Sequence, residues 1–250
     1  MKHLFIIILI AGFASLHGQN QLDDQDRKTG PWKVEYPNGK TLYEANFKKG
    51  KPVGEMVRYY ENGAVRARMM FDTLVDRSFT KLYYKNEKQA AEGWHVEKVK
   101  DSVWTYYSEF DGAVRIRETY QEGDLHGMVK SYYSSGVVSE EVGWQKNIKN
   151  GAWNQYYENG SLRLQCSYEN NMLNGPYELF YADGTIKVRG TYLENRSNGT
   201  WSFFDESGSE LYSIEYKNGR AVDQKKYMQI MQDSLKRFEL ISEPESIQQF

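Results

Sequence analysis

Cysteine and proline are rare in this sequence, and its net charge is small. Cys166 is the only cysteine in 250 residues, so no intrachain disulfide can staple the fold. The five prolines are too few for an extended proline-rich linker. A net charge of −2 lacks the basic excess of DNA- and RNA-binding proteins, which excludes nucleic acid as an expected partner. Aromatic residues are abundant instead, with 20 Tyr, 11 Phe and 6 Trp, so we expect a core of rings carried on β-strands.

The chain begins with a short basic segment followed by an apolar run. Lys2 precedes apolar residues 4–14, which are too few for a membrane span of ~20 residues. Small residues follow at Ala14, Ser15 and Gly18. The pattern predicts a secretory signal peptide over residues 1–19, and therefore export to the periplasm, the cell envelope or the medium. An uncleaved anchor is the alternative, and the cleavage point stays open between Ala14 and Gln19.

Residues 29–222 consist of about eight copies of one motif. Successive copies start 24 residues apart, with one step of 25. A large side chain lies two positions after the start of most copies, and two aromatic residues lie at positions five and six. Self-similarity at a period of this length is typical of repeat architectures. The first residues of the copies are Gly30, Gly54, Ser78, Ser102, Gly127, Gly151, Gly175 and Gly199.

Two positions in the motif are typical of tight turns. About twenty positions after each start lies a residue that tolerates positive φ, such as Gly50 or Asn147. A second glycine lies about nine positions after most starts, and in several copies it follows an asparagine. These dipeptides predict type I′ hairpin turns, in which both central residues take positive φ. They are Asn38-Gly39, Asn62-Gly63 and Asn159-Gly160.

The second half of each copy alternates between apolar and polar residues. In the sixth copy Leu164 and Cys166 share one face, while Arg163 and Gln165 point the other way. This period of two predicts a half-buried antiparallel strand, in which Cys166 is a small core residue. An isolated hairpin is marginal in water, so we expect the copies to stack and bury their rings against one another. The third copy is degenerate, because it lacks the turn glycine and has Glu87 there.

The spacing of these residues resembles the MORN repeat family. The clearest match is the segment GAWNQYYENG at residues 151–160, and the resemblance covers about residues 29–222. It is most similar to the MORN-variant repeats of bacterial YwqK-like antitoxin proteins. The resemblance implies an all-β fold, an elongated single-layer antiparallel sheet of about eight stacked β-hairpins. It also implies a binding role, of which an antitoxin- or immunity-like function is one version.

The two ends of the array depart from the motif. Residues 20–28 are short and polar, and we expect a mature N-terminal tail there. Their aspartates lack the spacing of a calcium loop. Residues 223–250 are expected to form an amphipathic helix and a loose tail, because apolar residues recur at three and four positions from Met228 to Ile241. Asp223 is the candidate N-cap. The helix either covers the exposed edge of the last hairpin or binds a partner.

No catalytic or metal-binding constellation is evident in the sequence. His95 and His126 have no cysteine or histidine at metal-ligand spacing. Neither a nucleophile elbow, a phosphate loop nor a dinucleotide fingerprint occurs. We therefore expect a protein that is not an enzyme and needs no cofactor or metal.

Two rows of side chains are candidates for partner binding. The first contains the aromatic residue at position five of the motif, and the second contains basic residues of the second strands. Rigid aromatic rows suit contacts with proteins or sugars. Cross-strand packing between copies is the alternative for the rings, and a solvated face paired with acids such as Glu61 and Glu158 is the alternative for the basic residues. The candidate binding residues are Tyr59, Tyr83, Tyr132, Tyr156, Phe180, Arg115, Arg117, Arg163 and Arg189.

These observations favour an exported protein–protein interaction module. The partner is expected to be another protein, recognised by an extended face without bond making or breaking. A protein that binds an envelope glycan or a lipid surface is the alternative from a different class, and a purely structural spacer is a third interpretation.

Overall fold

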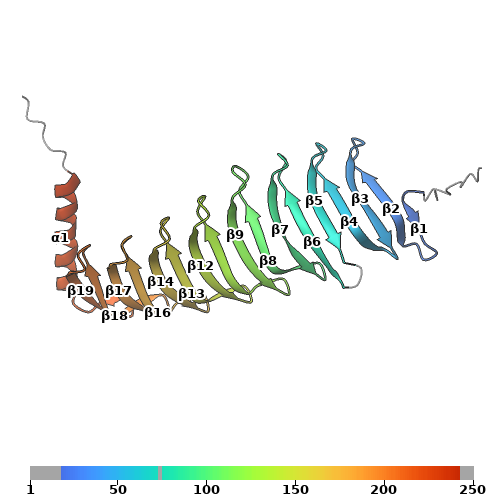
Figure 1. Cartoon of the computed structure of the whole chain (residues 1–250). Helices are drawn as coiled ribbons and strands as arrows, with labels where there is room; N and C mark the ends of the chain where they lie inside the picture. The colour runs from blue at the N-terminus through green and yellow to red at the C-terminus, as the bar shows by residue number, and fades with distance from the viewer. Residues whose placement is uncertain (1–17, 73–74, 243–250) are drawn as a thin grey trace, which may run out of the picture. The chain divides into compact units, whose positions relative to one another are not determined.

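The computed structural model describes residues 18–72 and 75–242. The predicted signal peptide, residues 1–19, lies almost wholly outside the described residues, as does the predicted tail beyond residue 242. The chain divides into two compact units, one ending at Glu87 and one beginning at Lys88. Each unit is a succession of antiparallel hairpins, and the prediction of about eight all-β hairpin repeats is confirmed (Figure 1).

The first unit contains six strands. Consecutive strands from β1 to β6 pair antiparallel through the unit. The strands are β1 (Gln21–Leu22), β2 (Lys28–Glu35), β3 (Thr41–Lys48), β4 (Lys51–Tyr59), β5 (Val65–Phe71) and β6 (Arg77–Tyr83).

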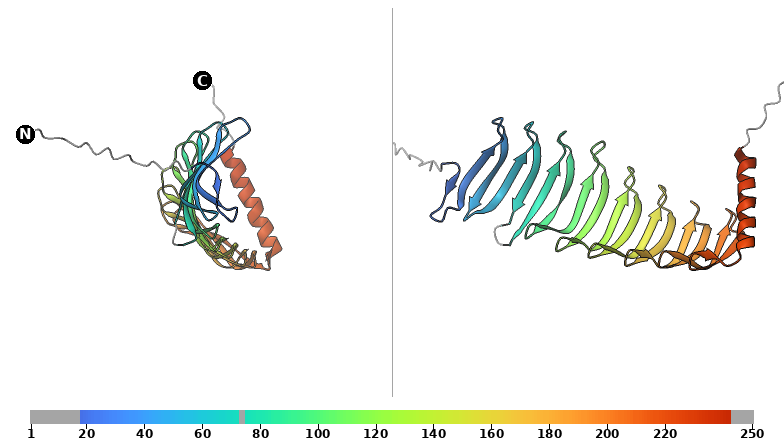
Figure 2. Two further views of the ribbon diagram at one scale, coloured as in Figure 1. Left: turned by 90° about the vertical axis from the view of Figure 1, so that its right-hand side faces the viewer. Right: turned by 180° about the vertical axis from the view of Figure 1, so that it is seen from behind.

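The second unit contains the remaining strands and the helix, and its hairpins follow one another in chain order (Figure 2). A short strand precedes each of β11 and β16, so the first strand of these two repeats is divided in two. The elements are β7 (Gln89–Val96), β8 (Val99–Tyr107), β9 (Val114–Gln121), β10 (Asp124–Leu125), β11 (Gly127–Tyr132), β12 (Val138–Gln145), β13 (Ile148–Tyr156), β14 (Leu162–Glu169), β15 (Met172–Leu173), β16 (Gly175–Phe180), β17 (Ile186–Leu193), β18 (Arg196–Phe204), β19 (Glu210–Lys217), β20 (Arg220–Ala221) and α1 (Gln224–Ser242).

The turn inside each hairpin is not the predicted type I′ turn. Gly39 has a φ of 79°, but Asn38 keeps a negative φ, and the same holds for the other two Asn-Gly dipeptides. The Gly39 N–H donates to the carbonyl of Tyr36, which makes a type I turn that ends in a left-handed glycine and a bulge. The asparagine is needed for a different reason: its side-chain oxygen accepts the N–H of Lys40 at 3.0 Å.

Type I′ turns occur between the repeats instead. Both central residues have positive φ at Lys146 and Asn147, and the same is true of the equivalent pairs in neighbouring repeats. Asn147 also bonds Leu125 of β10, just after the preceding inter-repeat turn, through two hydrogen bonds. Its N–H donates to the Leu125 carbonyl at 3.0 Å, and its side-chain oxygen accepts the Leu125 N–H at 2.8 Å. Asn171 and Asn195 repeat this arrangement, so asparagine at this position links successive repeats.

Residues 20–28, which we expected to be a tail, form a short hairpin with the first repeat. Strand β1 pairs with β2, and the carboxylate of Asp23 closes the turn by accepting the N–H groups of Gln25 and Arg27. Asn20 extends the pairing, because its side chain both donates to and accepts from the backbone of Lys33. These contacts cover part of the outer edge of β2, which would otherwise expose unpaired backbone groups.

The predicted C-terminal helix is present, and Asp223 is its N-cap. The Asp223 carboxylate accepts the N–H of Lys226 at 2.9 Å, three residues into the helix. Helix α1 contacts β19 at the end of the second unit (Figure 1). Met228 is 54% exposed, so the apolar side of the first turns is only partly covered.

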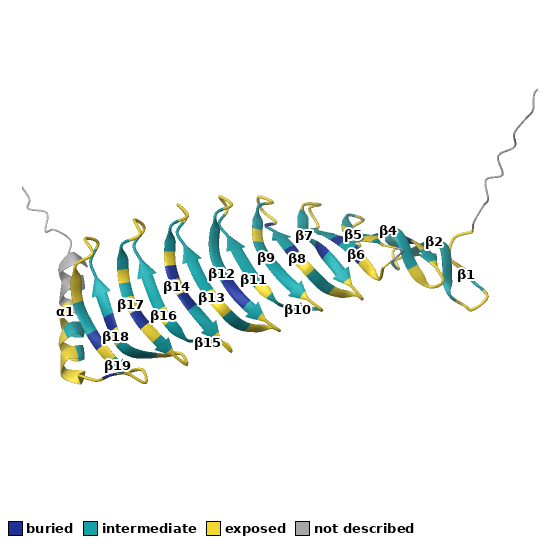
Figure 3. Cartoon of the chain, turned by 60° about the horizontal axis from the view of Figure 1, so that its bottom comes forward, coloured by how far each residue is buried: buried dark blue, intermediate teal, exposed yellow. Residues whose placement is uncertain are grey.

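Burial alternates along the second strand of several hairpins, as predicted. In β14, Leu164 and Cys166 are buried and Arg163 and Gln165 are exposed. Buried positions therefore form a row near the middle of the strands (Figure 3). The core is this row together with the rings on the same face of the sheet, and Cys166 is a small core residue as interpreted from the sequence.

Candidate functional site

The two faces of the hairpins carry different chemistry. We call the face that bears the ring two positions after each repeat start the tryptophan face, which includes Trp104, Trp153 and Trp201. The opposite face bears the ring at position five, including Tyr59 and Tyr156, and we call it the tyrosine face. The assignment follows from strand alternation and from pairs such as Trp153 opposite Cys166 and Asn154 opposite Gln165.

The tryptophan face is the hydrophobic core. Trp104 and Trp201 are 2% and 6% exposed, and each indole lies against a glycine of the preceding strand, Gly93 or Gly190. The Trp201 ring also lies 5.3 Å from Tyr177 and 5.0 Å from Tyr192 between centroids. These rings support one another from repeat to repeat, so this face provides stability.

Lysine side chains lie among aromatic rings on the tryptophan face, which the sequence analysis missed. The Lys100 ammonium is 5.0 Å from the Trp104 centroid and 4.7 Å from that of Tyr120. Lys28 and Lys149 make similar contacts in their own repeats. All three lie two positions before a repeat start, and this shared position is the sequence signal that could have found them. The chain's own lysines therefore occupy the spaces between these rings.

The aromatic residue at position six links neighbouring repeats. The Tyr157 hydroxyl donates to the carbonyl of Phe180 at 2.7 Å, and the Tyr133 hydroxyl donates to that of Tyr156 at the same distance. Tyr36, Tyr60 and Tyr181 do the same, each reaching a carbonyl 23 residues later. Position six is therefore structural, which leaves position five as the ring that can take part in binding.

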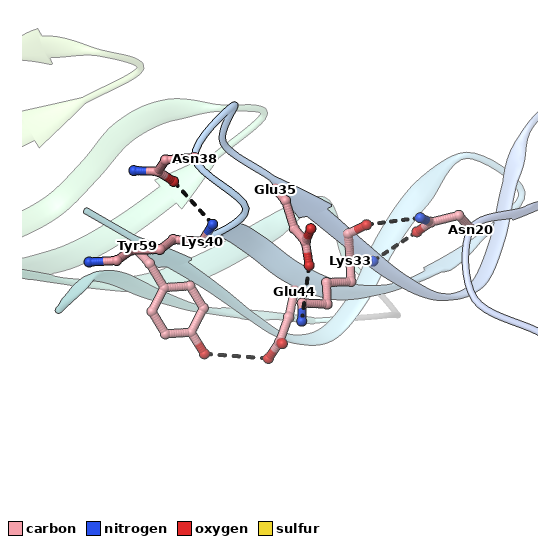
Figure 4. A network of polar contacts seen from close by, with 7 residues as sticks. All are labelled: Asn20, Lys33, Glu35, Asn38, Lys40, Glu44 and Tyr59. Atoms are coloured by element: carbon pink, nitrogen blue, oxygen red, sulfur yellow. Dashed lines mark hydrogen bonds and ion pairs between the residues drawn. The ribbon is translucent and has the colours of Figure 1, made fainter. Parts of the chain in front are cut away.

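The predicted rings at position five are half-buried and several are anchored through their hydroxyl groups. The Tyr156 hydroxyl donates to Glu141 at 2.9 Å, and Glu141 in turn pairs with Lys130 at 2.7 Å. In the first unit the Tyr59 hydroxyl lies 3.4 Å from the Glu44 carboxylate (Figure 4). Burial, assisted by the nearby carboxylate, raises the pKa of both tyrosines. Tyr83, Tyr132 and Phe180 are also half-buried.

The predicted arginines are all exposed, and Arg117 and Arg189 lie on the same face as the rings. Arg189 pairs with Glu178 at 3.0 Å, and the Arg117 guanidinium lies 5.5 Å from the Tyr132 centroid. Acids do pair with part of the basic row, but the acid that pairs with Arg189 lies directly across the hairpin rather than at the turn. Arg115 and Arg163 are exposed as well. Each of these two stands at a register shift of its hairpin, so strand alternation does not assign it to a face. In the second unit the structure thus brings Arg117, Arg189 and three of the rings onto one face.

The described residues show no assembly suited to bond-making chemistry or metal binding. No group of three or more metal-ligating side chains occurs within residues 18–72 and 75–242. His95 is packed edge-on against Trp104, and burial together with Lys100 lowers its pKa. Across the same described ranges, no helix combines the length and apolar character needed to span a bilayer.

The geometry defines a repeat protein built from β-hairpins. A family model described as the MORN repeat variant matches five of the repeats, at residues 28–49, 52–72, 125–146, 149–170 and 173–194. Five segments of the chain are therefore similar to the MORN repeat variant, in agreement with the resemblance found in its sequence. MORN repeats commonly mediate binding to proteins or membranes, and a binding module fits this repeat content. No curated protein matches the chain.

Proposed function

We propose that this chain is an exported, non-enzymatic protein–protein interaction module that binds its partner through the tyrosine face of the second unit. The observation that carries the proposal is the placement of Tyr132, Tyr156 and Phe180 with exposed arginines on one face. Aromatic and arginine side chains dominate the binding energy of many protein interfaces.

Anchoring of the rings supports this role. Tyr156 is held by Glu141, and Glu141 is held by Lys130. A ring that is already fixed loses little conformational entropy when a partner binds, which favours affinity. The arginines flank these rings and favour a partner with acidic groups.

Export rests on the predicted signal peptide over residues 1–19, and the antitoxin-like version rests on the resemblance to YwqK-like proteins. The two are compatible only if the toxin is met outside the cytoplasm. Fractionation of cells that express the chain with and without residues 1–19 tests export. Retention of both forms in the cytoplasm would contradict it.

The interaction role is tested by partner capture from the cell envelope. The full chain is compared with Arg117→Glu, which reverses a charge beside the Tyr132 ring on the tyrosine face, and with Lys146→Glu, which makes the same charge change in an exposed inter-repeat turn. We expect Arg117→Glu to lose the partner and Lys146→Glu to keep it. Equal capture by all three proteins would argue against the tyrosine face.

The exposed arginines of the second unit, such as Arg117 beside the Tyr132 ring, also motivate the alternative of a glycan- or lipid-binding protein. Sedimentation with peptidoglycan or anionic vesicles separates the two functions. Strong, salt-sensitive retention without a specific protein partner would favour surface binding. Absence of both retention and a partner would leave the spacer interpretation.

A further inference from the structure

Three basic side chains gather around one shallow hollow at the end of the second unit. Arg196, Lys217 and Arg220 line it together with Asn218, Ala221 and Val222, and its volume is about 720 Å³. Lys217 and Arg220 lie directly opposite each other where β19 pairs with β20. The stem of Arg196 lies over Gly219 of the same turn. Like charges placed this closely repel one another, so the arrangement favours a bound anion.

The first repeat contains the same three cations at equivalent positions, and there they are compensated. Arg27, Lys48 and Lys51 correspond to Arg196, Lys217 and Arg220, and Arg27 lies over Gly50 as Arg196 lies over Gly219. In the first unit Asp23 pairs with Arg27 at 2.8 Å, and Asp76 pairs with Lys51 at 3.3 Å. Two carboxylates thus form ion pairs with two of the three cations in the first unit.

The C-terminal copy has no such compensation. Among the residues that the structure describes, no carboxylate forms an ion pair with Arg196, Lys217 or Arg220. Helix α1 begins three residues after β20, and its first turn contains Lys225 and Lys226 and no acidic residue. The carboxylate of Asp223, the N-cap, accepts the Lys226 N–H and forms no ion pair with the three cations. Cations at a helix N-terminus oppose the helix dipole, so positive charge is in excess here.

The hollow also has an apolar side. Val222 is 61% exposed and adjoins the buried Ala221 at the base of the three cations. A ligand that fits would therefore carry carboxylates next to an apolar side chain. Arginine forks bind carboxylates through two parallel hydrogen bonds, which gives the pairing both strength and direction.

We propose that Arg196, Lys217 and Arg220 form a docking site for an acidic segment of a partner protein that presents an apolar side chain beside its carboxylates. The site deepens the proposed function, on which it rests, by assigning a second contact to the partner. The acidic segment of the partner supplies the negative charges that Asp23 and Asp76 supply within the first unit.

The test measures fluorescence anisotropy of a labelled peptide of alternating glutamate and leucine, titrated with the full chain. The double variant Arg196→Gln/Arg220→Gln should weaken binding about tenfold or more, since two charged contacts are removed. The matched control, Arg27→Gln/Lys51→Gln, makes the same change in net charge at equivalent positions. It should change affinity by less than about threefold. Circular dichroism of both variants checks that the sheet is intact.

Equal losses in the two double variants would overturn the site, because binding would then depend on net charge alone. Failure of the unmodified chain to bind the peptide would also overturn it. If phosphatidylserine-containing vesicles bound in an Arg196- and Arg220-dependent way and the peptide did not, the site would be one for lipid headgroups and the proposal would be wrong. Partner capture by the Arg117→Glu variant is scored separately, so the docking site can fail while the tyrosine-face proposal stands.

Discussion

Gly190 offers a sharp test of how the tryptophan face is packed. A Cβ atom added at this position would lie 2.2 Å from the Trp201 ring, far inside van der Waals contact. Trp201 is 6% exposed, and its indole N–H donates to the Thr191 carbonyl at 3.2 Å, so the ring cannot move without losing contacts. The same arrangement joins Gly93 and Trp104.

The expected effect of Gly190→Ala is a destabilisation of about 2 kcal/mol. Overpacking of a filled core costs about 1–3 kcal/mol, and loss of the indole hydrogen bond costs about 1 kcal/mol. Against these, alanine restricts the unfolded chain and returns about 0.4–1 kcal/mol. The clash therefore reverses the sign that a glycine-to-alanine change has at an unhindered site.

The assay is guanidinium denaturation of the full chain followed by circular dichroism, with m-values compared because repeat proteins can unfold in parts. The control is a cycle with Trp201→Ala. Once the ring is gone, Gly190→Ala should become neutral or stabilising, which gives a coupling of about 2 kcal/mol. If Gly190→Ala cost the same with and without the Trp201 ring, the packing argument would be refuted.

Three other predictions address the links between repeats and the tyrosine environment. Asn171→Gly keeps the positive φ but loses the hydrogen bond from the Lys149 N–H, so it should lower the free energy of unfolding by about 1 kcal/mol. Asn171→Ala should lower it further because alanine adds backbone strain, and the denaturation midpoints should rank in that order. Tyr157→Phe should lower stability by about 1 kcal/mol by leaving a carbonyl of the next repeat unpaired, and an unchanged midpoint would contradict the link. Burial and Glu118 raise the pKa of Tyr120 to about 12, so its contribution to stability is complete below pH 10 and lost as pH rises through 12. The absorbance change near pH 12 should be smaller by one tyrosine in Tyr120→Phe.

The hairpin turns show that local sequence was not sufficient to predict the turn type. Asn38-Gly39 is compatible with a type I′ turn and with a type I turn that ends in a bulge, because glycine suits both. The structure has the second, with a register shift between Val34 and Glu35 that accommodates the extra residue. Strand pairing decides between the two, and pairing is set by the neighbouring repeats. The inter-repeat turns were easier, since Asn147 and Gly50 stand where positive φ is required.

The sequence predicted which side of the strands carries the candidate binding residues, but it did not predict the contacts that their side chains make. Alternation along the strands placed Tyr156 on the side away from the buried Cys166, and Arg189 on the side away from the buried Gly190. It did not indicate that Glu141 would hold the Tyr156 hydroxyl, because that contact joins residues of neighbouring hairpins. The compensated and uncompensated basic clusters were likewise invisible, since their difference lies in contacts made by Asp23 and Asp76.

The sequence by itself determined the period, the hairpin in each repeat, the buried and exposed sides of the strands, and the capped helix at residue 223. These features follow from backbone preferences and polarity that act within about 24 residues. Only the tertiary structure decided which tyrosine of each pair is structural, which lysines lie among rings, and which charges remain unpaired. Those outcomes depend on atoms brought together from successive repeats, where a distance of a few ångströms decides between a hydrogen bond and an open site.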